Sequence, residues 1–197
     1  FHQYGYSIDD PANAGTAAVT GAGTIATATD QIIGIDVSTL DDDTLTFTVY
    51  LTDSAGNQGA DATDTVSKDT IAPTLTTVSI VSDNADTSLA KAGDTVTVSF
   101  TSSEALNGLP TVTIDGNAAD AVNGLGGNNY TATRVMQAGD SEAAVVFTID
   151  FTDLAGNPGV QVPATTDASS VTFDETPPVG YSVTYDQAAI NAANQNA

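Results

Sequence analysis

The sequence has no cysteine and no tryptophan, and its 197 residues include a single histidine, His2. Without cysteine, disulfides and thiol chemistry are excluded, so a domain of this kind needs a good core or a bound metal for stability. One histidine leaves no material for a histidine-based zinc site or a serine–histidine–aspartate triad. Aromatic residues make up 6% of the chain, and nothing marks two carboxylates as a glycosidase pair. We therefore expect no enzymatic activity and no organic cofactor.

Positive charge is nearly missing, since 3 Lys and Arg stand against 25 Asp and Glu, for a net charge of −22. Nucleic acid is excluded as a partner because almost nothing would neutralise its phosphates, and anionic membrane surfaces are disfavoured for the same reason. Self-repulsion at this charge destabilises a compact fold unless salt or bound cations screen it. Two interpretations are compatible: a solubilising surface suited to a saline medium, and carboxylates that bind divalent cations.

Long apolar runs and helical stripes are also missing. No segment approaches the roughly 20 apolar residues that cross a bilayer, so we expect no membrane insertion. Apolar residues instead alternate with Thr and Ser between turns rich in Gly, Asn and Asp, which is typical of β-strands. The alternation predicts strands at residues 4–9, 17–24, 31–37, 43–52 and 62–67, and then at 74–82, 94–103, 111–115, 129–136, 143–152 and 169–174. Residues 84–92 are predicted to hold a turn of helix.

The strongest pattern is a repeat. The motif Thr-Asp-x-Ala-Gly-Asn-x-Gly occurs at residues 52–59 and again 100 residues later, at 152–159. Each copy follows an alternating apolar run and precedes an acidic junction with proline, at residues 69–73 and 174–178. Six or seven short strands in about 100 residues favour an Ig-like Greek-key sandwich. We therefore predict an all-β protein of two tandem Ig-like domains, residues 1–70 and 71–176, followed by a further segment at 177–197.

The two ends of the sequence differ from a simple pair of domains. Nothing before Tyr4 has the pattern of an opening strand, so we expect the first domain to be incomplete. Residues 179–185 read as one strand more than the second domain needs, and a polar tail follows. One interpretation is that this segment completes the first domain of a neighbouring copy or repeat by strand addition, giving head-to-tail self-association. The other is that the sequence samples a tandem array at an arbitrary phase.

Several oxygen-bearing side chains are predicted to converge where the two domains meet. Asp69 lies in the linker, Glu104 follows the second strand of the second domain, and Asp153 and Asn157 belong to the second copy of the motif. In an Ig-like sandwich these loops share one pole, and Ca²⁺ prefers six to eight oxygen ligands. The candidate calcium ligands, with their counterparts at the other junction, are Asp69, Glu104, Asp153, Asn157, Asp53, Asn57 and Asp174. A simpler explanation is that the motif is a tight turn whose Asp binds local amides.

A further acidic run, residues 41–43, does not have the spacing of an EF-hand loop. We expect it to form a solvated turn before the strand at 43–52.

Four segments carry a family resemblance: residues 98–105 (Val-Ser-Phe-Thr-Ser-Ser-Glu-Ala), 111–114, 129–133 and 147–157 (Phe-Thr-Ile-Asp-Phe-Thr-Asp-Leu-Ala-Gly-Asn). They resemble the bacterial Ig-like tandem repeats of giant surface adhesins, whose linkers have the Asp-x-x-x-Pro form of residues 69–73. Residues 1–70 resemble a second subtype of the same repeats, and residues 180–184 resemble the opening strand of that subtype.

The resemblance implies an extracellular stalk on the bacterial surface, often stiffened by calcium between domains. We expect a structural extender of an adhesin or filament, because the loops are short turns. The alternative is a ligand-binding adhesion module for a glycan, ice or a protein.

Overall fold

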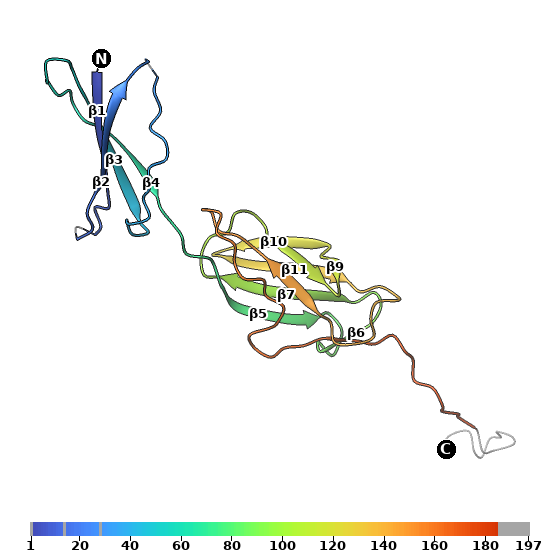
Figure 1. Cartoon of the computed structure of the whole chain (residues 1–197). Helices are drawn as coiled ribbons and strands as arrows, with labels where there is room; N and C mark the ends of the chain where they lie inside the picture. The colour runs from blue at the N-terminus through green and yellow to red at the C-terminus, as the bar shows by residue number, and fades with distance from the viewer. Residues whose placement is uncertain (1, 14, 28, 185–197) are drawn as a thin grey trace.

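The structure, a computed structural model, describes residues 2–13, 15–27 and 29–184, and these residues form strands and connections without any helix. Figure 1 shows two groups of strands joined by an extended segment. We call β1–β4 the first unit and β5–β13 the second unit, because the strands of each sheet come from one group alone. The strands are β1 (His2–Asp9), β2 (Val19–Ile25), β3 (Thr44–Thr52), β4 (Ala62–Ser67), β5 (Leu75–Ser82), β6 (Leu89–Ala90), β7 (Thr95–Ser102), β8 (Thr111–Ile114), β9 (Asn117–Ala118), β10 (Ala121–Gly126), β11 (Asn129–Val135), β12 (Phe147–Asp150) and β13 (Thr172–Phe173).

The first unit is one antiparallel sheet of four strands in the order β2-β1-β3-β4. The register pairs Ile8 with Phe47 and Tyr6 with Val49. Directly paired residues of antiparallel strands point to the same side, so these side chains make one face of the sheet apolar. Among the described residues of the first unit, the buried hydrophobic core consists of Ile8, Leu40 and Leu45.

The second unit has two facing layers. One sheet has the order β10-β11-β7-β5 and the other has the order β12-β8-β9, while β13 pairs with β6 in parallel. Both layers contribute to one buried core, for example through Val98 of β7, Ile114 of β8 and Ile149 of β12. An antiparallel arrangement whose two sheets share a core is consistent with a β-sandwich.

Most predicted strands are confirmed, with small shifts at their ends. Residues 4–9, 17–24, 43–52 and 62–67 match β1 to β4, and 74–82, 94–103, 111–115 and 129–136 match β5, β7, β8 and β11. The predicted strands at 143–152 and 169–174 contain the shorter β12 and β13. Alternation marks which side chains face a core, and here it locates the paired strands well.

Two local predictions are wrong, those for residues 31–37 and 84–92. Residues 31–37 alternate like a strand but have no ladder partner among the described residues. Residues 179–184 are also unpaired in the described part of the chain, so their expected pairing with another copy or repeat stays a prediction, and residue 185 lies outside the described residues. Residues 84–92 form turns and the short β6 instead of a helical turn. Strand β10 was not predicted, because its glycines are typical of a turn. It pairs with β11, with a register shift between Gly124 and Gly126.

In the described part of the chain, no helix has the length and apolar character required to cross a membrane.

Candidate metal centre

The repeated motif folds into a turn that its own aspartate holds. In the second unit, Oδ1 of Asp153 accepts hydrogen bonds from the amides of Gly156 (2.7 Å) and Asn157 (2.8 Å). Oδ2 of Asp153 accepts one from the Asn157 side chain at 2.8 Å. Gly156 has a φ of +98°, a conformation that a residue with a Cβ rarely adopts. The predicted turn chemistry is therefore confirmed.

The first copy of the motif forms the same turn. Oδ1 of Asp53 accepts hydrogen bonds from the amides of Ala55 and Asn57 at 2.9 and 2.8 Å, and the Asn57 side chain donates one to Oδ2 at 2.9 Å. Gly56 has a φ of +90°. These hydrogen bonds, with the one from the Asn57 side chain first, lower the pKa of Asp53. The two turns differ in exposure, because Asp153 is 1% exposed whereas Asp53 is only partly buried.

The second turn gathers the three carboxylates that the sequence predicted to converge. Asp69 from the linker, Glu104 from the loop after β7 and Asp153 each place a carboxylate oxygen within 4.8 Å of the others. A β-bridge between Leu106 and Asp153 fixes the two loops of the second unit against each other. Asn157 adds a connection to the linker, since its Nδ2 donates to the carbonyl of Asp69 at 3.1 Å.

The electrostatics of the group follow from crowding of like charges. Partial burial raises the pKa of Glu104, and the neighbouring charges of Asp69 and Asp153 raise it further. Burial also raises the pKa of Asp153, but the hydrogen bonds from Asn157 and Gly156 outweigh it and leave the pKa lowered. Asp153 therefore stays ionised, and Glu104 is the member that carries the unrelieved repulsion.

The donor set fits a hard divalent cation. All three side chains offer carboxylate oxygens, and no described residue donates a hydrogen bond to the carboxylate of Glu104. A hollow of about 300 Å³ adjoins the group and is lined by Ser67, Asp69, Glu104, Ala105, Leu154 and Ala155. Ca²⁺ takes six to eight oxygens from carboxylates, carbonyls and water, so these carboxylates with water would complete its coordination.

The other predicted ligands do not join a group of three acids among the described residues. Asn157 points its Nδ2 at Asp153 and Asp69, so it braces the group by donating hydrogen bonds. The Asn57 side chain donates a hydrogen bond to Asp53, and neither residue belongs to the group of three carboxylates. The carboxylate of Asp174 accepts a hydrogen bond from the amide of Thr176 at 2.9 Å, just as that of Asp69 accepts one from the amide of Ile71 at 3.0 Å. Asp174 thus repeats the local structure of Asp69 at the second junction.

One acidic residue was wrongly predicted to be solvated. Asp42 forms an ion pair with Lys68 at 2.8 Å, and its Oδ2 accepts the amide and hydroxyl of Thr70 at 2.8 and 2.6 Å. The hydrogen bond from Lys68 is the main cause that lowers the pKa of Asp42 to about 2. Lys68 also donates to the carbonyl of Leu40. No sequence pattern indicated these contacts, which tie the start of the linker to the first unit.

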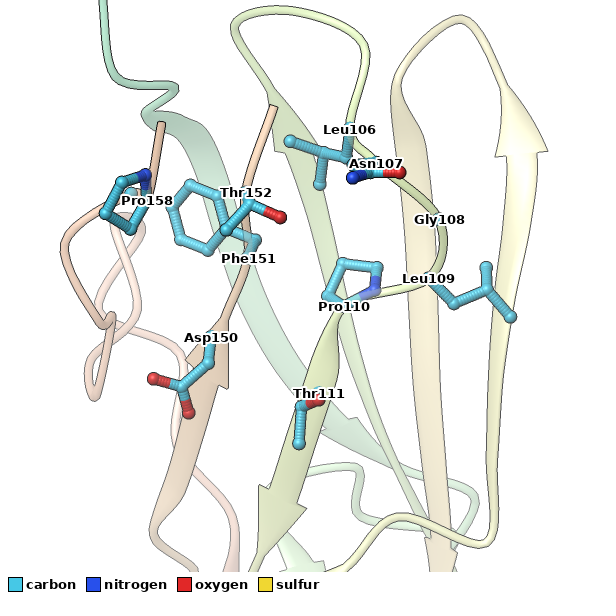
Figure 2. Close-up of a pocket in the computed structure, with 11 residues that line it drawn as sticks. Leu106, Asn107, Gly108, Leu109, Pro110, Thr111, Asp150, Phe151, Thr152 and Pro158 are labelled. Atoms are coloured by element: carbon cyan, nitrogen blue, oxygen red, sulfur yellow. The ribbon is translucent and has the colours of Figure 1, made fainter. Parts of the chain in front are cut away.

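The second unit has another hollow, of about 290 Å³, between the loop before β8 and the end of β12. Figure 2 shows Leu109, Pro110 and Phe151 around it, with Asp150 as its carboxylate. Both oxygens of Asp150 already accept hydrogen bonds from the Gln161 side chain, at 2.9 and 3.0 Å. Binding sites for small molecules usually combine apolar walls with several convergent polar groups, and this hollow offers one satisfied carboxylate.

No protein-family model matches the chain, and a search of curated proteins gives no significant match.

Proposed function

We propose that this chain is a structural extender of a bacterial cell-surface adhesin or extracellular filament. In this proposal the two units are Ig-like domains in a tandem, head-to-tail assembly, and Ca²⁺ stiffens the joint between them. The single observation that carries the proposal is the meeting of Asp69, Glu104 and Asp153, because one of these acids belongs to the linker and two belong to loops of the second unit. A cation there would bind the linker to the second unit.

The linker is fastened on both sides of this site. Asp42 holds Thr70 to the first unit, while the Asn157 side chain holds the Asp69 carbonyl to the second. On the second unit, the amide of Thr74 also donates to the Ser103 hydroxyl at 3.0 Å. A linker with contacts to both units has little conformational freedom. This suits a rigid spacer rather than a flexible tether.

The strand order supports the Ig-like part of the proposal. In the second unit the layers β10-β11-β7-β5 and β12-β8-β9 alternate along the chain, so that β8 and β9 leave the first layer and β10 and β11 return to it. This exchange between two antiparallel sheets is the connection expected of a Greek-key sandwich. An extracellular location agrees with the net charge of −22 and with the dependence on cations that such a charge creates.

Calcium is expected to raise the stability of the second unit. A ligand that binds only the folded state at a hundredfold excess over its dissociation constant adds about 2.7 kcal/mol. Thermal unfolding should therefore shift upward when Ca²⁺ replaces a chelator at constant ionic strength. The Glu104→Gln variant should lose this shift, because the substitution removes the carboxylate that has no hydrogen-bond donor among the described residues.

Glu175→Gln is the matched control, because it makes the same chemical change at an exposed residue outside the acidic group. The control should keep the full response to Ca²⁺. An unfolding midpoint of the unmodified chain that is the same with Ca²⁺ and with chelator would refute the metal site.

A further inference from the structure

One face of the first unit lacks the cover that the second unit gives to the equivalent strand. The two copies of the motif align β3 with β12 at an offset of 100 residues. In the second unit, Ile149 is fully buried and Phe151 is 7% exposed. Their counterparts in the first unit are Val49, which is only partly buried, and Leu51, which is 48% exposed. The first unit therefore has apolar side chains at the same positions of the repeat, but no second sheet packs over them among the described residues.

The second unit shows what such a cover consists of. There the sheet β10-β11-β7-β5 lies over β12 and β8 and contributes buried core residues from β5, β7 and β11. In the first unit the corresponding side holds only an irregular segment, from which Ile35 and Val37 pack beside Ile8, Leu40 and Leu45. Beyond them an open hollow of about 380 Å³ remains, and it is lined mostly by apolar residues, together with two polar ones: Tyr4, Ile25, Ile32, Phe47, Val49 and Leu51, with Thr29 and Asp30.

Residues 31–37 begin beside this hollow, where Ile32 lines it, and their backbone amides are unpaired among the described residues. Ile33, Ile35 and Val37 alternate with Gly and Asp as in a strand, and Ile33 is 82% exposed. No described residue accepts a hydrogen bond from the amides of residues 31–37. Backbone groups of this kind form ladder hydrogen bonds readily when a second strand is offered.

Residues 179–184 are a second strand-like segment without a ladder partner among the described residues. Val179, Tyr181 and Val183 alternate along it and are 86%, 75% and 93% exposed. The segment leaves the second unit at the end opposite to the linker from the first unit (Figure 1). A strand that exposes every second side chain as a large apolar group normally packs against another layer.

Position within the repeat identifies residues 179–184 with β5. Asp174 and Asp69 make the same turn, and each is followed four residues later by a proline, Pro178 and Pro73. The same register places Val183 where β5 has Val78, which is 1% exposed in the core. In the second unit, the chain entering at Asp69 crosses the turn of Asp153 and continues into β5.

We propose that residues 179–184 of one copy form a strand beside residues 31–37 of a second copy and cover the apolar face of β1 and β3. This inference rests on the head-to-tail assembly proposed above and names the two surfaces that meet. Asp174 of one copy would then lie at the turn of Asp53 in the next, as Asp69 lies at the turn of Asp153. The contact is heterologous, so its repetition gives a linear filament.

Charge supports this choice of surfaces. Residues 179–184 contain no charged side chain, and residues 31–37 contain one, Asp36, although the chain has 25 acidic residues. Two copies that each carry a charge of −22 repel each other over most of their surfaces, so association is expected through these segments of low charge and at moderate ionic strength.

The absence of native cysteine permits a direct test on the full chain. Two variants, Ile33→Cys and Val183→Cys, are mixed under mild oxidation at concentrations where sedimentation shows association. We expect a disulfide-linked pair of different chains, at a yield at least fivefold above that of Val160→Cys mixed with Val183→Cys. Val160 is a matched control because it is 83% exposed in the second unit. A disulfide requires Cα atoms within about 7 Å, so the yield reports a specific contact.

The outcomes separate the inference from the proposed assembly. If the chain associates but the Ile33→Cys and Val183→Cys mixture gives only the control yield, the assembly stands and these surfaces are wrong. If Ile33→Cys instead links mainly to itself, the first units meet face to face and the inference is overturned. If a variant that carries both Ile33→Cys and Val183→Cys in one chain closes a disulfide within that chain, the strand is donated in cis and the contact between copies is refuted. A chain that stays monomeric at all concentrations refutes both assembly and inference, and leaves the calcium test of the joint unaffected.

Discussion

Arg134→Met is expected to destabilise the second unit by about 3–5 kcal/mol, because it leaves a buried carboxylate without its partner. Arg134 in β11 makes two hydrogen bonds of 2.8 Å to the carboxylate of Asp140. The two side chains are 7% and 10% exposed, so solvent screens the pair little. The hydrogen bond from Arg134 also lowers the pKa of Asp140, although burial opposes it. Urea unfolding followed segment by segment by hydrogen exchange measures the change at β7 and β11.

The sign of the pH dependence follows from that lowered pKa. A carboxylate whose folded pKa lies below its unfolded value of about 3.9 stabilises the fold above that pH, and the stabilisation is lost as the pH falls through the folded pKa. The unmodified chain should therefore lose stability on acidification more steeply than Arg134→Met. The double variant Arg134→Met with Asp140→Leu is the control, since it removes the uncompensated charge and should recover most of the loss. A change below about 0.5 kcal/mol in the single variant would contradict a buried ion pair.

Phe173→Ala is expected to have a similarly large effect, about 3–5 kcal/mol, because it opens a cavity in a closed core. Phe173 belongs to β13 and is fully buried, although this strand has only two residues. The strand runs parallel to β6, and the amide of Asp174 donates to the carbonyl of Ala90 at 2.9 Å. Loss of the Phe173 ring should therefore also reduce the hydrogen-exchange protection of β6, the strand that pairs with β13.

Leu154→Ala provides the comparison for Phe173→Ala, because Leu154 is 71% exposed in the same unit. Exposed substitutions usually change stability by less than about 0.5 kcal/mol. Equal urea midpoints for the two variants would show that β13 does not close the core.

Alternation in the sequence predicted the all-β architecture and most of the strands, because side chains that face a core repeat every second residue. The clearest case is β3, where Leu45 and Phe47 face the core side. The same signal failed for residues 31–37, since alternation records which side chains need cover but not whether a neighbouring strand is present. Strand β10 was missed for the opposite reason. Its glycines are typical of turns, but its backbone pairs with β11, and these backbone hydrogen bonds do not depend on side chains.

The candidate site was predictable to the extent that it follows the repeat. The matching positions of the motif and the linker acid led directly to Asp69 and Asp153, and the loop after the second strand led to Glu104. The burial of Asp153 and the pairing of Asp42 with Lys68 depend on how distant loops settle in three dimensions. No local pattern encodes such contacts, so only the structure could show them.

The most direct test of a cation-stiffened joint is the distribution of distances between the two units. Spin labels can be attached to cysteines introduced at Thr63 of β4 and Thr77 of β5, which are both exposed. Pulsed electron paramagnetic resonance then reports the distance between the labels without interference from native cysteine. We expect a broad distribution with chelator and a narrow one with Ca²⁺, and Glu104→Gln should abolish the narrowing. Distributions of equal width with and without Ca²⁺ would contradict the proposed stiffening of the joint.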